Sequence, residues 1–105
     1  MAKGGYIYIL TNKHKTILYI GVTSDLLNRI WQHKNHIYTN SFTDKYNVEY
    51  LIYYEFFEHI ETAIEREKEL KKWRREKKDV LINSKNKEWS DLYNEILKDN
   101  YSLLG

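Results

Sequence analysis

The sequence predicts an α+β fold in which a small three-stranded sheet, in the order β-β-α-β-α, is flanked by helices and followed by extra C-terminal helices. Three short runs of aromatic and β-branched residues predict the strands, and apolar residues at helical spacing predict the helices. A chain of 105 residues has room for one modest core. We therefore expect a single domain, with its core at about residues 5–78 and a helical extension at about 79–100.

The first two predicted strands form a hairpin. Tyr6–Leu10 is aromatic and β-branched, Thr11–Lys15 is a polar turn, and Ile17–Ile20 supplies the returning strand. The third predicted strand, Val48–Phe57, is apolar on both faces, which is typical of a strand inside a sheet. We therefore expect this strand at the centre of the sheet.

Capping residues and apolar spacing predict the helices. Thr23–Asp25 offers N-cap candidates for a helix that ends near Lys34. Residues 35–47 are polar and aromatic and are expected to form a long loop. A strong helix is predicted over Ile60–Glu76, and one or two shorter helices are predicted over residues 78–98.

The composition excludes several classes of protein. No cysteine is present, so a disulfide framework, a thiol nucleophile and a cysteine-ligated zinc site are excluded. No apolar run approaches the roughly 20 residues that a membrane helix needs. The N-terminus runs into a strand pattern, so we expect no signal peptide. We expect a cytoplasmic protein with no membrane partner. Of its histidines, His14, His36 and His59 are expected at the surface.

Positive charge gathers in one segment, although the formal net charge is only +2. The basic segment, Arg66–Lys78, holds eight basic residues and three acids. A local excess of this kind can hold phosphates through charge. A solvated helix with ion pairs between residues four apart explains the segment equally well when it is considered alone.

Several short motifs follow one another in order along the chain. They are Tyr6-Ile7-Tyr8, then Tyr19-Ile20-Gly21, then Asn28-Arg29 with His33 four residues on, and later the run Ala63–Trp73. As an ordered set they resemble the GIY-YIG endonucleases, such as the N-terminal domain of the excinuclease and the catalytic domains of homing endonucleases. The tail Trp89-Ser90-Asp91-Leu92 is similar to small stand-alone bacterial members. The family's first motif usually begins with glycine, and Tyr6 stands there in this chain, a difference that concerns packing at the start of the strand.

The resemblance implies a metal-dependent endonuclease that hydrolyses phosphodiester bonds in DNA, with branched or damaged DNA in repair or recombination as candidate substrates. By this resemblance, Tyr8 of this chain would activate the attacking water, and Tyr19 and His33 would support it through hydrogen bonds. Arg29 would hold the scissile phosphate and stabilise its developing charge. Glu67 would be the one protein ligand of a Mg²⁺ or Mn²⁺ ion, which keeps mostly water ligands. No small-molecule cofactor is implied.

Helical spacing sets Glu67 apart from the other acids of its segment. At 100° per residue, Glu67 shares the face of the apolar stripe that begins at Ile60, whereas Glu65 and Glu69 point the opposite way. An inward carboxylate is costly unless it is paired or bound to a metal. An ion pair with Lys71, one turn along the same face, is the alternative explanation, and the family resemblance favours the metal.

Spacing alone leaves the roles of the other motif residues open. Arg29 and His33 lie one turn apart at the edge of an apolar stripe, which suits side chains that reach over a cleft. It suits equally an arginine that extends into solvent and a partly exposed histidine. Antiparallel pairing can bring Tyr8 and Tyr19 to one face, where strand tyrosines are more often packing residues. Gly21 ends its strand and favours a close backbone approach.

Candidate nucleic-acid contacts lie outside these motifs. Lys45 and Tyr46, with Phe42, stand in the loop before the third strand and can act through charge and stacking. Lys71 and Arg74 belong to the basic segment. Packing within the loop explains its aromatic residues equally well.

Two other classes of function stay open. The chain could be a non-catalytic nucleic-acid-binding module with the same fold, or a protein-interaction domain that uses its aromatic surface. Magnesium-dependent nicking would separate the endonuclease from both. A steep loss of nucleic-acid binding with salt would separate the first two from the third. The choice of DNA or RNA and the oligomeric state cannot be predicted from the sequence.

Overall fold

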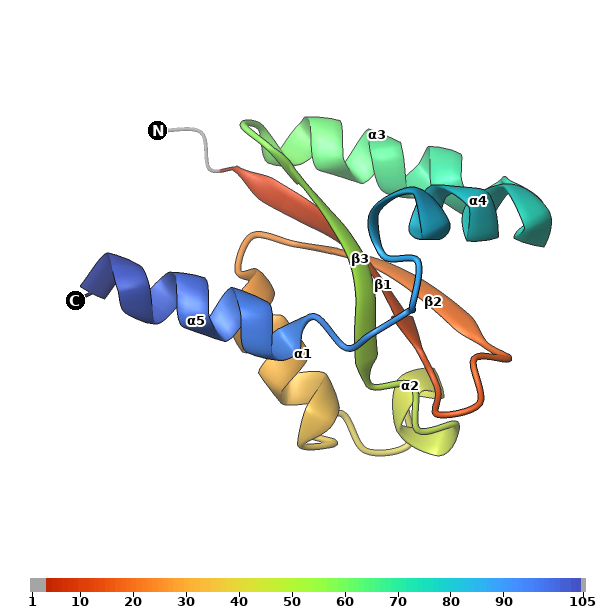
Figure 1. Ribbon diagram of the computed structural model, residues 1–105, viewed down its shortest axis with the longest axis horizontal. Coiled ribbons are helices and arrows are strands. Elements are labelled where there is room, and N and C mark those ends of the chain that lie inside the picture. Colours follow the sequence, from red (N-terminus) through yellow and green to blue (C-terminus); the bar gives the residue numbers. More distant parts are fainter. Residues whose placement is uncertain (1–3, 105) are drawn as a thin grey trace.

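Helices cover both faces of a three-stranded antiparallel sheet in the computed structural model, which describes the backbone of residues 4–104 and the side chains of residues 4–99 (Figure 1). The elements are β1 (Gly5–Thr11), β2 (Leu18–Thr23), α1 (Leu26–Lys34), α2 (Phe42–Lys45), β3 (Tyr50–Phe57), α3 (Ile60–Lys71), α4 (Arg75–Lys85) and α5 (Tyr93–Leu104). The predicted α+β class, with a three-stranded sheet flanked by helices, is confirmed. None of these described helices is long and apolar enough to cross a membrane.

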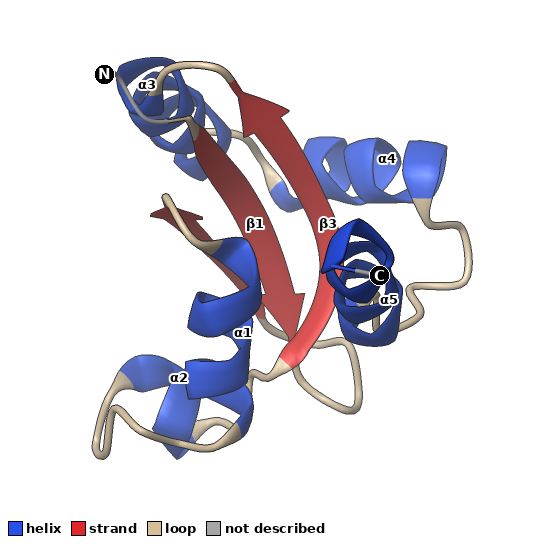
Figure 2. Ribbon diagram, turned by 90° about the vertical axis from the view of Figure 1, so that its left-hand side faces the viewer, coloured by secondary structure: helices blue, strands red, loops and turns tan. Residues whose placement is uncertain are grey.

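The strand order is β2-β1-β3, and β1 is antiparallel to both neighbours. The prediction that the third strand, Val48–Phe57, lies at the centre of the sheet is therefore wrong, because β3 is an edge strand. It is apolar on both faces because helices pack above and below it (Figure 2). An apolar pattern on both faces thus indicates that helices cover both faces of the strand. It does not indicate whether the strand has a neighbour on each side in the sheet.

The outer edge of β3 is covered by the segment that precedes α5. The backbone N–H of Leu92 donates to the carbonyl of Leu51 at 2.7 Å, and the N–H of Leu51 donates to Asp91 Oδ1 at 3.1 Å. Lys34, at the end of α1, forms an ion pair with Asp91. These contacts satisfy backbone groups that an open sheet edge would expose, and they join the tail to α1.

The strands divide the core into two halves because successive side chains point to opposite faces of a sheet. The residues buried between the sheet, α3 and α4 are Ile7, Ile9, Ile20, Ile52, Tyr53, Ala63, Leu70 and Ile82. Those buried with α1 and α5 are Tyr8, Leu10, Leu26, Ile30, Val48, Leu51 and Ile96. Tyr8 therefore projects from the central strand towards α1.

The single helix predicted over Ile60–Glu76 is in fact two helices. α3 ends at Lys71, and Arg74 has extended backbone angles before α4 begins. The break turns the chain so that Trp73 and Ile82 both pack against the half of the core that α3 already covers. Helical periodicity continues through the break in the sequence, so the spacing alone does not reveal it.

Candidate functional site

The three aromatic residues of the predicted site form one cluster on the α1 face of the sheet. The Tyr8 hydroxyl lies 3.1 Å from Nε2 of His33, which belongs to α1. The ring centroids of Tyr8 and Tyr19 are 6.3 Å apart, and those of Tyr19 and His33 are 5.8 Å apart. The two strands therefore bring both tyrosines to the same face, where each contacts the histidine.

Gly21 provides the space for the Tyr8 ring. The two residues are partners across the β1–β2 pair. A Cβ atom at position 21 would lie 2.4 Å from both Cζ and the hydroxyl oxygen of Tyr8. None of the described glycines has a positive φ, so close approach and not backbone conformation requires glycine here. The predicted close approach at Gly21 is confirmed.

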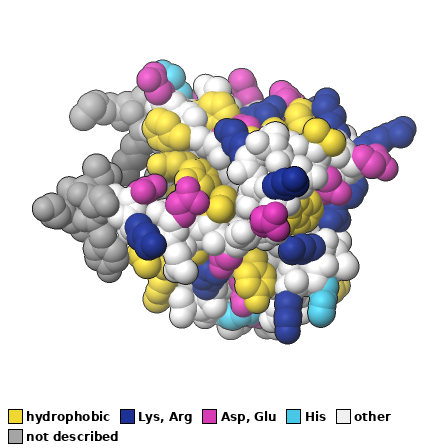
Figure 3. Space-filling view, in the orientation of Figure 1, with side chains coloured by type: hydrophobic (Ala, Val, Ile, Leu, Met, Phe, Trp, Pro, Cys, Tyr) yellow, Lys and Arg dark blue, Asp and Glu magenta, His cyan; other side chains and the backbone are white. Residues whose placement is uncertain are grey.

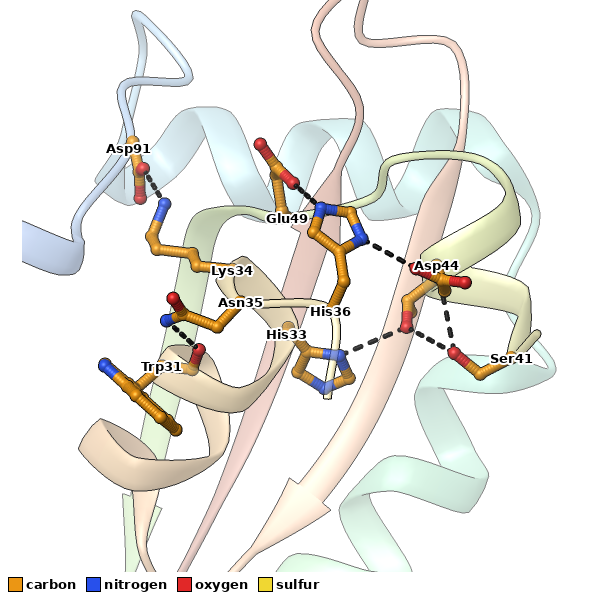
Figure 4. Close-up of polar contacts among 10 residues, drawn as sticks. Trp31, His33, Lys34, Asn35, His36, Ser41, Asp44, Glu49 and Asp91 are labelled. Carbon is orange, nitrogen blue, oxygen red and sulfur yellow. Dashed lines mark hydrogen bonds and ion pairs between the residues drawn. The ribbon is translucent and has the colours of Figure 1, made fainter. Parts of the chain in front are cut away.

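His33 is buried, and both of its ring nitrogens have partners. Nε2 contacts Tyr8, and Nδ1 lies 3.2 Å from Oγ1 of Thr43 in α2, the short helix inside the predicted 35–47 loop. Figure 4 shows the His33 ring pointing towards this helix. Burial, followed by the charge of Arg29, lowers the pKa of His33 from 6.5 to about 4. The imidazole is therefore neutral at neutral pH.

The Tyr8 side chain is 1% exposed, and burial raises the pKa of its hydroxyl above the usual value. Proximity to Tyr19 raises this pKa further, the Arg29 guanidinium lowers it, and the Glu67 carboxylate raises it. Tyr8 is consequently a neutral phenol at neutral pH. The same interactions place Arg29 and Glu67 within electrostatic reach of the phenol.

Arg29 lies at the mouth of this cluster, one helical turn before His33. Its guanidinium carbon is 5.7 Å from the centroid of the Tyr38 ring. It helps to line an open cleft of about 280 Å³. The lining residues are Tyr19, Arg29, His33, Tyr38, Ser41, Phe42 and Thr43. A guanidinium in such a cleft can hold two oxygens of one phosphate.

Glu67 lies on the inward side of α3, as its spacing predicts. Its side chain is 15% exposed, against 55% for Glu69, and Glu65 is exposed. Its carboxylate is 3.5 Å from the ammonium of Lys71, so the ion pair expected as the alternative is present. Lys71 is itself 55% exposed, and an ion pair with an exposed lysine contributes little to stability.

The donor set around Glu67 can be compared with the needs of a metal ion. Among the described residues, no group of three histidines and carboxylates converges on one point. A single carboxylate such as Glu67 does not suit zinc, which takes three or four protein ligands. It is sufficient for Mg²⁺ or Mn²⁺, because a hard cation can keep most of its water ligands and bind through one carboxylate.

The candidate nucleic-acid contacts of the 35–47 loop lie beside the cleft. Phe42 stacks on Tyr19 with ring centroids 6.3 Å apart, and Tyr46 follows at 4.9 Å from Phe42. Phe42 and Tyr46 are 48% and 51% exposed, and Lys45 is also exposed. These rings thus form an accessible aromatic surface that leads away from Tyr19.

The basic segment is divided between α3 and α4, and some of its arginines are already engaged in hydrogen bonds within the protein. Arg66 binds Glu55 through two hydrogen bonds of 2.9 and 3.1 Å, and Arg75 donates to two backbone carbonyls of the β1–β2 turn. Lys71 and Arg74 are exposed, and neither is among the described residues that line the cleft. Figure 3 shows acids scattered among the lysines and arginines on the face that it displays.

His36 is a structural residue that the sequence does not reveal. The sequence predicts it at the surface, but its ring is half-buried and lies 2.8 Å from both Asp44 and Glu49 (Figure 4). The hydrogen bond to Asp44 is the main cause of its raised pKa. His36 therefore joins α2 to the start of β3 and holds the loop that carries Thr43. The three residues have no recognisable spacing, so only the fold brings them together.

One family model and one solved structure are similar to this chain. The family model described as the GIY-YIG catalytic domain matches residues 4–79, which is more than half of the chain and includes all five predicted catalytic residues. The chain is similar to the solution NMR structure of the UPF0213 protein BH0048 from Bacillus halodurans, with a TM-score of 0.54 and 28% identity. That similarity covers 84% of this chain and 92% of the other. No curated protein matches the chain. The chain belongs to the GIY-YIG family, and its fold is of the nuclease type.

Proposed function

We propose that this protein is a metal-dependent endonuclease that hydrolyses phosphodiester bonds in DNA, with branched or damaged DNA as the substrates to test first. The observation that carries the proposal is the buried hydrogen bond between Tyr8 and His33, which lies beside Arg29 at the cleft. A buried phenol needs an acceptor in any case; what favours catalysis is that this acceptor, His33, lines the open cleft together with Arg29.

Tyr8 acts as a proton relay in this proposal. Its raised pKa means that it does not start as a phenolate at neutral pH. As the water oxygen bonds to phosphorus, the water proton moves to the Tyr8 oxygen while the phenolic proton moves to Nε2 of His33. His33 is neutral beforehand, and the free lone pair on its Nε2, 3.1 Å from the Tyr8 hydroxyl, can accept that proton. Tyr19 packs on both rings and supports their placement.

Arg29 binds the phosphate in this proposal. Its guanidinium lies in the cleft next to the pair of Tyr8 and His33, where it can donate to two non-bridging oxygens. Negative charge grows on those oxygens as the fifth bond to phosphorus forms, so a fixed cation stabilises the transition state more than the bound substrate. The contact with the Tyr38 ring restricts the arginine before substrate binds.

Glu67 would hold the metal ion. When bound, Mg²⁺ or Mn²⁺ supplies a positive charge that polarises the phosphate and neutralises the leaving oxygen. The carboxylate suits this role because it points inward, and Lys71, with which it forms an ion pair, is exposed and can move away. Exposed Lys45 and Tyr46, with Lys71 and Arg74, are the side chains that we propose contact the rest of the nucleic acid.

The test is cleavage of supercoiled plasmid, branched DNA and structured RNA with Mg²⁺, with Mn²⁺ and with chelator. We expect metal-dependent nicking of DNA that Tyr8→Phe lowers by about 10²-fold or more, the usual contribution of a general base. Tyr54→Phe is the matched control, because Tyr54 pairs with Tyr8 on the adjacent strand but its hydroxyl does not contact His33. Binding without cleavage of any substrate would favour the non-catalytic module instead.

A further inference from the structure

A chain of polar contacts connects the proposed catalytic pair to α2. Tyr8 is 3.1 Å from His33 Nε2, and His33 Nδ1 is 3.2 Å from Thr43 Oγ1. Thr43 Oγ1 is in turn 3.2 Å from Oγ of Ser41, the N-cap of α2. Tyr8, His33 and Thr43 are 1%, 7% and 6% exposed. Because Tyr8 is almost fully buried, its hydroxyl hydrogen must find an acceptor within the protein before substrate binds, whereas His33, Ser41 and Thr43 also line the open cleft.

The Tyr8 hydroxyl sets the direction of these hydrogen bonds. Arg29 carries only donors, so it can give a hydrogen to the Tyr8 oxygen but cannot accept one. Among the described residues, His33 Nε2 is the acceptor that lies within hydrogen-bond distance of this hydroxyl. The phenolic hydrogen therefore points at Nε2. A neutral imidazole has one N–H, so Nδ1 carries the hydrogen and donates it to Thr43.

At the other end of these contacts, Ser41 can accept a hydrogen bond from Thr43, which is consistent with this direction. Ser41 Oγ already accepts the backbone N–H of Asp44 and retains a lone pair for the Thr43 hydroxyl hydrogen. The reverse direction would place the hydrogen on Nε2 and leave the phenolic hydrogen of Tyr8 without an acceptor in a buried site. An unsatisfied buried donor of that kind is costly.

We propose that Thr43 is a positioning residue that holds His33 in the Nδ1–H tautomer, so that its Nε2 lone pair faces Tyr8. Its expected effect on cleavage rests on the proposed function, whereas its effect on the tautomer does not. Thr43 lines the cleft, but its hydroxyl lies against His33 and Ser41, so we assign it no contact with the reacting groups. It acts through His33, and it is itself held in place by Ser41 and by the backbone hydrogen bond from Val48 to its carbonyl.

The tautomer is measured directly from the ring ¹⁵N shifts of His33 near pH 7, with the signals assigned by comparison with His33→Gln. We expect protonated Nδ1 and unprotonated Nε2 in the wild type and in Thr43→Ser, which keeps the hydroxyl. Thr43→Val has the same shape without the hydroxyl, and it should show a population with protonated Nε2. Thr39→Val is the matched control, because Thr39 is exposed on the same loop, and it should leave the ring shifts unchanged.

Protonated Nε2 in the wild type would overturn the proposal without any variant, and so would an unchanged spectrum in Thr43→Val. In cleavage assays, Thr43→Val should lower kcat by about tenfold or more with little change in KM, since only the proton step is affected. A changed tautomer with unchanged kcat would refute the positioning role. If the wild type shows the Nδ1–H form but cleaves nothing, the proposed function fails while the tautomer assignment stands.

Discussion

Gly21→Ala tests whether the site depends on the close approach of β2 to the Tyr8 ring. In a strand interior, alanine would ordinarily be more stable than glycine by roughly 0.5–1 kcal/mol. Here its Cβ would lie 2.4 Å from Cζ and the hydroxyl oxygen of Tyr8. The ring cannot yield freely because it is buried against Tyr19 and His33. Overpacking of this kind costs about 1–3 kcal/mol.

The collision therefore outweighs the propensity, and the net loss should be about 1–2 kcal/mol. For a chain of this size, that loss lowers Tm by roughly 5–15 °C. Displacement of the hydroxyl from His33 should also reduce cleavage on the order of 10²-fold, a loss that a shift of about 1 Å can cause. Thermal unfolding and plasmid nicking measure the two effects separately.

A double-mutant cycle identifies the cause of the loss. In a Tyr8→Leu background the ring is absent, so Gly21→Ala should cost little or should stabilise the protein. An unchanged Tm for Gly21→Ala in the wild type would show that the collision does not occur. An equal loss of Tm in both backgrounds would show that the collision with Tyr8 is not its source.

Three further predictions concern charge. Arg29→Lys keeps the positive charge but loses the planar guanidinium, so cleavage should be badly impaired. Near-normal cleavage by this variant would mean that Arg29 contributes only its positive charge. The pKa of His33 falls from 6.5 to about 4 on folding, so its contribution to stability is complete above pH 6.5 and declines as the pH falls towards 4. In denaturant titrations at several pH values, His33→Gln should make the free energy of unfolding depend less steeply on pH in this range. An unchanged pH dependence would contradict the lowered pKa. In salt titrations of DNA binding, Arg74→Gln should reduce the log–log slope by about one, whereas Arg66→Gln, whose charge Glu55 already neutralises, should change it little.

The fold class could be predicted because local patterns specify it. The polar turn between two aromatic runs forms the expected hairpin, and Asp25 caps α1 by accepting the N–H of Asn28. The position of β3 could not be predicted in the same way. Its apolar pattern reflects burial by helices on both faces, and its edge is closed by Asp91 and Leu92, about forty residues later in the chain. No local pattern records such a contact.

The candidate site was predictable only as far as the motifs extend. The ordered motifs select Tyr8, Tyr19 and His33, and the structure brings these three rings together. The loop that completes the site has no motif of its own. Thr43 contacts the histidine only because α2 forms and His36 holds it against the start of β3. These contacts depend on tertiary structure, so spacing could not indicate them.

Glu67→Gln tests the central claim, that the inward carboxylate serves a metal and not the fold. Glutamine has nearly the same size but is a poor ligand for a hard cation. We expect the variant to lose Mg²⁺-dependent nicking while it binds DNA as well as the wild type or slightly better. Its Tm without metal should hold or rise, since Lys71 is exposed and loses little with the ion pair.

Glu65→Gln is the control, because Glu65 lies on the exposed side of the same helix, and it should change neither property. The decisive measurement is plasmid nicking by Glu67→Gln with Mg²⁺ alongside its metal-free Tm. A variant that is folded, binds DNA and does not cut is the predicted result. A variant that melts early yet still cuts would contradict the account.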